Sequence, residues 1–282
     1  MCCKTSQCFL IYSSVSSRRE FHPGGCSHSQ CPFLILIIHS GFFHLPLFFK
    51  LLGARYIMLA ESAKNLVPKF FDETGATYDG VVSYGTLGKD KYWKRKILEQ
   101  ISDGNSFLDL ACGTGILTRE IAEKFPSAEI VGVDITKSYL DVAKQNSNSF
   151  DNISFILDDA EECKLDSKFD CITASYLPKY CDPEVLVKNC VAHLKPGGKI
   201  IFHDFTYPKN PAVRGLWNFF LTFLRLVGCF IPSWKDALIG LPKLIRRTKW
   251  LDSYSDAMKK SGLKVSHQYL TYGVSAILTG TK

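Results

Sequence analysis

Two glycines between a short apolar run and a helical pattern are the first residues whose spacing suggests chemistry. Residues 107–118 read FLDLACGTGILT, so we predict a buried strand over 107–111 and a helix from about Ile116. Gly113 and Gly115 would let the backbone approach a ligand closely, beside the unpaired N–H groups of the helix start. The stretch predicts a nucleotide-type pocket, with a tight turn that binds nothing as the alternative.

The charge around this turn distinguishes between nucleotide ligands. A dinucleotide-binding turn has the pattern GxGxxG, whereas this sequence has Thr118 at the third glycine position. Asp109 lies in the strand just before the turn, where it would repel a pyrophosphate. The same carboxylate suits a ligand that carries an ammonium and a sulfonium group and no phosphate. S-adenosylmethionine fits that description, and a nicotinamide oxidoreductase is disfavoured.

Strands and helices alternate after the turn. Apolar runs predict strands over 129–134, 153–157, 169–175 and 198–205, and helical spacing predicts helices over 116–125, 136–145 and 183–194. A helix that links two successive strands forms a right-handed crossover connection between parallel strands. The strands therefore form a parallel sheet, and ligands bind at their carboxyl ends. The predicted fold class is therefore α/β, a Rossmann-like doubly wound sheet.

Polar residues fall at the predicted carboxyl ends of these strands. Asp134 ends the second strand, where an acid accepts hydrogen bonds from ribose hydroxyls. Asp158 and Asp159 end the third strand, where a carboxylate can accept from an adenine amino group while the Ala160 N–H faces a ring nitrogen. Helix capping or a solvated turn is the alternative for the two acids, and we expect only one to face the ligand. Ser175 ends the fourth strand.

The first 57 residues differ in composition from the rest. They hold five of the eleven cysteines and four of the seven histidines. Their net charge is +4 of the total +7, from Lys4, Arg18, Arg19, Lys50 and Arg55 against Glu20. The remainder is only mildly basic, so nucleic-acid binding is not predicted. No Cys or His spacing typical of zinc occurs, so no metal is predicted.

Three origins compete for residues 1–57. The apolar run over 32–52 suggests a signal anchor, but His39, Ser40, His44 and Pro46 interrupt it. The serine-rich stretch before it resembles an organellar transit peptide. The third hypothesis is that translation begins at Met58, and we expect little stable structure before that residue. The six later cysteines lack pairing motifs, which is typical of a reducing cytosol and predicts a cytoplasmic protein with a catalytic domain over 58–282.

The segment before the glycine turn carries apolar residues at helical spacing over 59–71 and 92–101. Between these predicted helices, TYDG at 77–80 and SYG at 83–85 indicate a turn-rich loop. This aromatic loop either closes over a ligand or is a surface linker, and periodicity alone does not choose between the two.

Taken together, the motifs resemble those of class I S-adenosylmethionine-dependent methyltransferases, and more narrowly those of the ubiquinone/menaquinone biosynthesis C-methyltransferase family. The resemblance extends from about Tyr78 to the C-terminus, with YWKR at 92–95, LDLACGTG at 108–115, FDCITAS at 169–175, LKPGG at 194–198, DFTYP at 204–208 and LPKLIRR at 241–247. It implies S-adenosylmethionine as cofactor and C-methylation of a prenylated quinol of the demethylmenaquinol or demethylubiquinol type. It also implies seven mostly parallel strands with an antiparallel last strand, the last two over 264–270 and 274–280.

The resemblance assigns roles to individual positions. Thr118 matches a cofactor-contacting threonine, and the implied cofactor site comprises Asp109, Gly113, Gly115, Thr118, Asp134, Ile135, Asp159, Ala160 and Ser175. The family commonly has an Arg-Asn pair shortly after the strand-four serine, where this chain has Lys179 and Tyr180. The spacing between Tyr78-Asp79 and SYG at 83–85 is also shorter than is typical. Both departures bear on the methyl acceptor.

Methylation of carbon requires an electron-rich acceptor, such as a quinol that has lost a phenol proton, so we expect a general base. Positioning and desolvation supply most of the catalysis. Asp204 and His203 are the candidate bases after strand five, although such residues are more often structural. Tyr176, Lys179 and Tyr207 are candidate substrate contacts.

Residues 211–250 are predicted as a helical cap between strands five and six. Their aromatic run is too short to span a bilayer and is interrupted by Arg225. Two such helices would cover a prenyl tail and rest on a membrane surface beside Lys243, Arg246, Arg247 and Lys249, or would form the core of the cap. A different small-molecule or lipid acceptor, and a catalytically inactive S-adenosylmethionine-binding partner, stay open as alternatives. The sequence does not indicate an oligomeric state.

Overall fold

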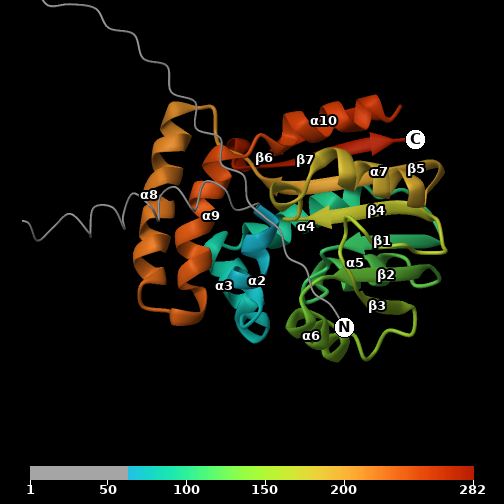
Figure 1. Ribbon diagram of the computed structural model, residues 1–282, viewed down its shortest axis with the longest axis horizontal. Helices are drawn as coiled ribbons and strands as arrows, with labels where there is room; N and C mark the ends of the chain where they lie inside the picture. Colours follow the sequence, from blue (N-terminus) through green and yellow to red (C-terminus); the bar gives the residue numbers. More distant parts are fainter. Residues whose placement is uncertain (1–62) are drawn as a thin grey trace, which may run out of the picture. The chain divides into compact units, whose positions relative to one another are not determined.

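The computed structural model describes residues 63–282, and the predictions for residues 1–57 lie outside that range. A seven-stranded sheet has the strand order β3-β2-β1-β4-β5-β7-β6 (Figure 1). Its strands are β1 (Ser106–Leu110), β2 (Glu129–Asp134), β3 (Ile153–Leu157), β4 (Phe169–Ser175), β5 (Leu194–Phe205), β6 (Lys264–Leu270) and β7 (Ser275–Thr281). The first five strands pair in parallel, and β7 runs antiparallel to both of its neighbours. The predicted α/β sheet with an antiparallel last strand is confirmed.

Helices lie on both faces of this sheet and beside the carboxyl ends of its central strands (Figure 1). They are α2 (Leu66–Phe71), α3 (Tyr78–Gly85), α4 (Lys89–Gln100), α5 (Ile116–Lys124), α6 (Lys137–Asn146), α7 (Pro183–His193), α8 (Pro211–Gly228), α9 (Lys235–Arg247) and α10 (Trp250–Lys260). Successive side chains of a strand point to opposite faces. Leu108 accordingly packs in one buried cluster with α7 and α10, and its neighbour Phe107 packs in another with α4 and α5. The sheet is therefore doubly wound.

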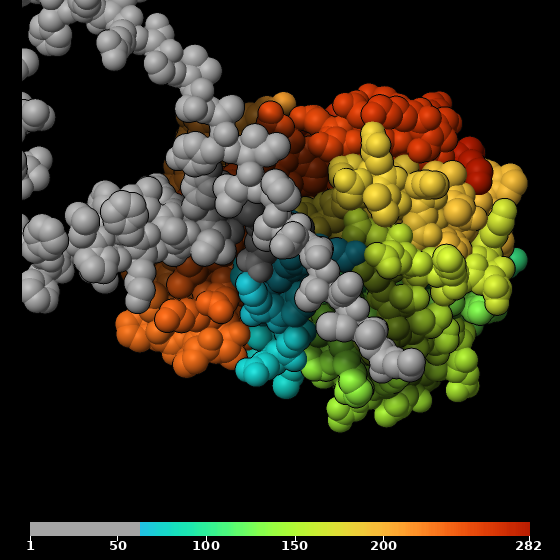
Figure 2. Space-filling view, in the orientation of Figure 1, coloured from blue at the N-terminus to red at the C-terminus, as the bar shows by residue number. Residues whose placement is uncertain are grey.

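The prediction of a turn-rich loop over 77–85 is wrong, because these residues form helix α3. A glycine costs about 1 kcal/mol in a helix interior. Val81 and Val82 of α3 line a cavity, and we attribute the helix to this packing, which outweighs the cost of Gly80. The segment from α2 to α3 contacts α9 and, through the turn after α2, α6 (Figure 2). Parts of the chain that are far apart in sequence therefore meet around this segment.

Two long helices, α8 and α9, follow β5 and precede α10 and β6 in the chain. Asn210 caps α8 by accepting hydrogen bonds from the N–H groups of Ala212 and Val213, and Pro211 occupies the first helical position. Figure 1 shows α9 between α8 and the segment of α2 and α3. None of the helices within residues 63–282 has the length and apolar character needed to cross a bilayer.

Candidate functional site

A cavity lies at the carboxyl ends of the central strands. Its empty volume is about 1270 Å³, a figure that includes the part open to solvent. One end, here called the strand end, is lined by residues that follow β1, β2 and β3, including Gly113, Asp134 and Asp158. The other, the helix end, is lined by α3, α8 and α9, including Val82, Leu224 and Leu241. One continuous cavity thus joins the sheet to helices α3, α8 and α9.

The glycine turn after β1 forms part of the strand end. Gly113 and Gly115 have φ values of 58° and 76°, in the left-handed region that favours glycine. A Cβ atom on Gly113 would lie 3.7 Å from the Tyr139 ring, so the backbone conformation and not a lack of space selects glycine there. Gly113 lines the cavity; Gly115 instead begins α5 and lets it approach Ala143 of α6.

Asp134 joins the end of β2 to this turn. Its Oδ2 accepts a hydrogen bond from the Gly113 N–H at 2.8 Å, and its Oδ1 accepts one from the Thr136 N–H at 2.8 Å. Burial raises the pKa of the Asp134 carboxyl, and these two hydrogen bonds oppose the rise. Each carboxylate oxygen keeps a further lone pair for a ligand hydroxyl. Ile135, which follows, lines the same wall with 47% of its surface exposed.

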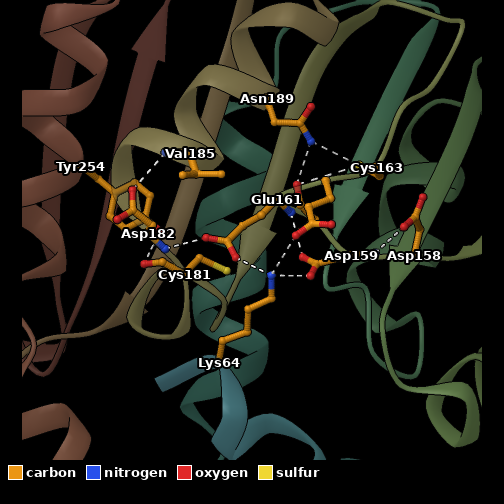
Figure 3. Close-up of polar contacts among 12 residues, drawn as sticks. Lys64, Asp158, Asp159, Glu161, Cys163, Cys181, Asp182, Val185, Asn189 and Tyr254 are labelled. Carbon is orange, nitrogen blue, oxygen red and sulfur yellow. Dashed lines mark hydrogen bonds and ion pairs between the residues drawn. The ribbon is translucent and has the colours of Figure 1, made fainter. Parts of the chain in front are cut away.

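Lys64 closes the strand end from the N-terminal side, in a contact that we call the Lys64 latch. It forms ion pairs with Asp159 and with Glu161, the latter at 2.7 Å (Figure 3). Burial opposes its charge, but hydrogen bonds to the two carboxylates raise the pKa of Lys64. Asp158 accepts a hydrogen bond from the Asp159 N–H at 2.7 Å, and both acids line the cavity with Ala160. Of the two, Asp159 is therefore the one engaged by Lys64.

The structure does not bring Asp109 and Thr118 to the cavity wall. The Asp109 carboxylate is buried between two hydroxyls and accepts hydrogen bonds from Thr118 at 2.7 Å and Thr173 at 2.8 Å. Burial raises the pKa of Asp109 to about 6. This carboxylate therefore ties helix α5 to strands β1 and β4, beneath the glycine turn.

His203 lies in the sheet between two serines. Its Nδ1 is 2.9 Å from Ser175 Oγ, and its Nε2 is 2.7 Å from Ser275 Oγ. Ser275 donates its hydroxyl proton to the Asp204 carbonyl, so Nε2 donates to Ser275 and Nδ1 accepts from Ser175. Burial lowers the pKa of His203 well below its ordinary value. Ser175 lines the cavity, but His203 does not, and both of its ring nitrogens are occupied. His203 is not placed to act as a base.

Asp204 is buried beneath Lys179 and is likewise absent from the wall. Lys179 Nζ donates to Asp204 Oδ1 at 2.9 Å and to the Tyr176 carbonyl, and it lies 4.4 Å from the centroid of the Tyr180 ring. Burial lowers the pKa of Lys179 and raises that of Asp204, and their mutual attraction opposes both shifts. Lys179 is among the residues that line the cavity and Asp204 is not, so Lys179 is the member of the pair nearer to a ligand bound there.

Tyr176 lies where the two ends of the cavity meet. Its φ of 65° is unusual for a bulky residue. Its hydroxyl donates to Asp90 Oδ1 at 2.8 Å, and Lys94 pairs with the same oxygen at 2.5 Å. Its ring stacks on Phe205, with centroids 5.1 Å apart. These contacts fix the ring as part of the wall.

Tyr207, the third candidate substrate contact, does not line this cavity. Its hydroxyl pairs with the Asn218 side-chain amide of α8, 2.9 Å from Nδ2. It lines a separate pocket between β5 and α10 instead.

The helix end is mostly apolar. Its lining comes from α3, α8, α9 and the turn before α9, namely Val81, Val82, Leu224, Trp234, Ala237, Leu238 and Leu241. Trp234 stacks on Tyr78, with ring centroids 6.2 Å apart, and donates a hydrogen bond to Thr77 at 2.9 Å. Among the described residues that line this end, Lys179 carries the charge. An acceptor here would meet aliphatic and aromatic walls and one cationic group.

Sequence reasoning missed several residues of the site. Lys64 and Tyr78 gave no motif beyond helical spacing and a turn, although both line the cavity. Asp90 and Lys94 are four residues apart, a spacing that predicts an ion pair within a helix but not the link to Tyr176. Tertiary packing buries the Asp90 and Lys94 side chains, and no local sequence pattern predicts this burial.

The doubly wound sheet, the glycine turn and the acid at the end of β2 define a class I S-adenosylmethionine-dependent methyltransferase. A model of the ubiE/COQ5 methyltransferase family matches residues 58–282, and the chain belongs to that family. It is 30% identical to the ubiquinone/menaquinone biosynthesis C-methyltransferase UbiE of Hahella chejuensis, over 82% of this chain and 96% of that protein.

Solved structures share the fold at low sequence identity. An O-methyltransferase family protein from Burkholderia thailandensis aligns with a TM-score of 0.56 and 15% identity, covering 85% of this chain and 70% of that one. A geranyl diphosphate C-methyltransferase from Streptomyces coelicolor, solved with S-adenosyl-L-homocysteine, aligns with a TM-score of 0.51 and 11% identity, covering 68% and 79%. Family membership and fold together imply S-adenosylmethionine as the methyl donor.

Proposed function

We propose that this protein methylates a ring carbon of a quinol precursor of the demethylmenaquinol or demethylubiquinol type. The observation that supports the proposal most is a single cavity whose polar strand end and apolar helix end meet at Tyr176 and Lys179. Such a cavity suits a polar donor at one end and an aromatic, greasy acceptor at the other. The name of the Hahella chejuensis relative supports the same acceptor class.

The residues of the strand end fit the donor. Asp134 would accept from ribose hydroxyls, Ile135 would cover one face of the adenine, and Gly113 would face the methionine part. Asp158 or Asp159 would accept from the adenine amino group, with the Lys64 latch holding Asp159 in place. When bound, S-adenosylmethionine supplies a methyl group that its sulfonium makes electrophilic.

The residues of the helix end would hold and activate the acceptor. Apolar side chains of α3, α8 and α9 exclude water from the ring and its tail. The Lys179 ammonium favours the phenolate over the phenol, because an adjacent positive charge stabilises the anion. In this scheme Lys179 takes the place of a general base by lowering the cost of losing the phenol proton to solvent, and the proton on the methylated ring carbon also leaves to solvent, which restores the aromatic ring. Asp204 keeps Lys179 oriented from behind.

The test is methyl transfer to a short-tailed demethylmenaquinol under reducing conditions, followed by mass spectrometry of the ring-methylated product. Calorimetry with S-adenosylhomocysteine measures donor-site affinity separately. Asp134→Asn is expected to weaken that affinity about 10- to 100-fold, because it removes charged hydrogen bonding. Asp141→Asn is the matched control, since Asp141 pairs with Lys137 on the exposed face of α6.

Thermal unfolding of each variant shows whether the fold is kept. Tight donor binding with no transfer to demethylmenaquinol, or to demethylubiquinol assayed in the same way, would make the acceptor assignment wrong. Absence of donor binding to the folded wild-type protein would contradict the proposed methyltransferase activity as a whole.

A further inference from the structure

Helix α8 has two apolar sides. Its inner side packs in the core through Trp217 and Leu221, and Leu224 reaches the cavity. Its outer side presents a second row of apolar residues, three or four positions apart, which we call the outer stripe. The outer stripe consists of Leu216, Phe219, Phe223 and Leu226, followed by Phe230 just past the end of the helix. This spacing places the residues on one side of a helix.

The outer stripe is unusually exposed for its composition. Phe219 is 74% exposed and Phe230 is 86% exposed. Five of the twelve large apolar side chains that are exposed within residues 63–282 fall in this short span. Contiguous exposed apolar surface marks a site of interaction, whereas scattered apolar residues do not.

The segment that carries the outer stripe is rich in positive charge. Residues 206–249 contain eight basic residues, Lys209, Arg214, Arg225, Lys235, Lys243, Arg246, Arg247 and Lys249, and one acid, Asp236. The rest of the described chain holds 21 Lys and Arg against 24 Asp and Glu. Arg246 of α9 donates a hydrogen bond to Asn218 of α8 at 3.1 Å, which holds one of these cations against α8.

We propose that the outer stripe docks on an anionic lipid bilayer, with α8 lying in the interface. Its aromatic and aliphatic side chains enter the acyl boundary, and the Lys and Arg side chains of residues 206–249 face the anionic headgroups. Charge favours an anionic bilayer over two other partners for the outer stripe, a second copy of this chain and residues 1–57. A second copy of the same face would bring two basic surfaces together, and residues 1–57 carry a net charge of +4 themselves.

Docking would place the cavity next to the lipid. The helix that carries the outer stripe also lines the helix end through Leu224, and its neighbour α9 lines it through Leu238 and Leu241. An amphiphile of the bilayer would then have a short path to the helix end. The docking surface itself does not depend on which acceptor is methylated.

The experiment is co-sedimentation of the full-length protein with vesicles of phosphatidylcholine and phosphatidylglycerol in equal parts, compared with phosphatidylcholine alone. We expect binding to the anionic vesicles that weakens as salt is added. Phe219→Ser with Phe223→Ser should lower the partition coefficient on the order of 100-fold, by removing two inserted rings. Arg214→Glu with Arg247→Glu should lower it at least about tenfold.

The matched control is Val185→Ser, which removes an exposed apolar side chain of α7, on the other side of the sheet region from α8 (Figure 1). It should bind vesicles like the wild type. Donor affinity measured by calorimetry should be the same in all variants, which shows that each is folded and separates this result from the quinol assay.

The proposal is overturned if the Phe variant binds anionic vesicles as the wild type does. Equal binding to uncharged vesicles would also overturn it. So would a wild-type protein that ignores vesicles, whether it self-associates through the outer stripe or remains monomeric.

Discussion

The two ends of the cavity are built in different ways. At the strand end, the Asp134 carboxylate accepts hydrogen bonds from the backbone N–H groups of Gly113 and Thr136, at the carboxyl ends of β1 and β2. At the helix end, apolar side chains from α3, α8 and α9 form the wall together with Lys179, and Asp204 pairs with Lys179 from behind. Backbone geometry defines the first end, and packing between distant segments defines the second. The strand end suits a ligand that a whole class of enzymes shares, whereas the helix end can differ between members of that class.

The largest expected effect tests whether the Lys179–Asp204 ion pair at the helix end stabilises the fold. Lys179→Ala leaves Asp204 as an unpaired buried carboxylate and should lower the free energy of unfolding by about 3–5 kcal/mol. Chemical denaturation measures the change. Donor affinity under conditions where the variant is folded should be unchanged, because Asp134 and Gly113 are untouched.

The double variant Lys179→Met with Asp204→Asn is the control for this effect. It removes both charges and keeps a side-chain oxygen near the Phe205 N–H, which the Asp204 carboxylate now satisfies at 2.7 Å. It should recover most of the lost stability but not methyl transfer. Full activity in this variant would contradict a role for Lys179 in stabilising the phenolate.

A second effect concerns the buried acid beneath the strand end. Because burial raises the pKa of Asp109 from 3.8 to about 6, the folded state binds more protons than the unfolded state between these pH values. Stability from this group is therefore greatest at low pH and falls as the pH rises to about 6, by up to about 3 kcal/mol. Asp109→Asn lacks this titration, so the difference in unfolding free energy between wild type and variant should itself change with pH over this range.

The same variant sharpens the comparison between the two ends. Since the Asp109 carboxylate pairs with Thr118 and Thr173 and does not line the cavity, Asp109→Asn should bind the donor as the wild type does. A large loss of affinity in calorimetry would show that Asp109 contacts the donor directly, as the sequence predicts.

The smallest effect concerns the Lys64 latch. Lys64 is partly exposed, so Lys64→Ala should cost no more than about 1 kcal/mol of stability. Dissociation of S-adenosylhomocysteine, followed by stopped-flow fluorescence, should nevertheless become faster, because one restraint on the segment that covers the strand end is lost. Lys137→Ala removes a comparable but more exposed pair and should leave the dissociation rate unchanged.

The strand end was largely predictable from sequence. The apolar runs, the glycines and the acid at the end of β2 are local signals, and parallel topology brings their carboxyl ends to one edge. The structure places Gly113, Asp134, Ile135, Asp158, Asp159, Ala160 and Ser175 on the cavity wall, as these signals indicate.

The other features of the site depend on contacts between residues far apart in the chain, which local sequence patterns do not show. Asp109 and His203 are in the expected strands, but whether a strand residue faces a ligand or an interior hydroxyl depends on its neighbours across the sheet. Helix α3 was missed because the sequence shows its glycines but not the packing of Val81 and Val82 on the cavity, which is lined from the other side by α8 and α9. Lys64 has partners that no spacing rule connects to it.

The Lys64 latch joins side chains 97 positions apart, and this separation orders events in time. As the chain is synthesised, Lys64 is made long before the carboxylates with which it pairs, so the segment from Lys64 to α3 has to wait for β3 and the turn after it. Long-range closures of this kind form late, and partly exposed pairs hold them weakly. The same segment also contacts α9, and Trp234 donates to Thr77 across 157 positions, so the wall that it supplies depends on nearly the whole domain having been made.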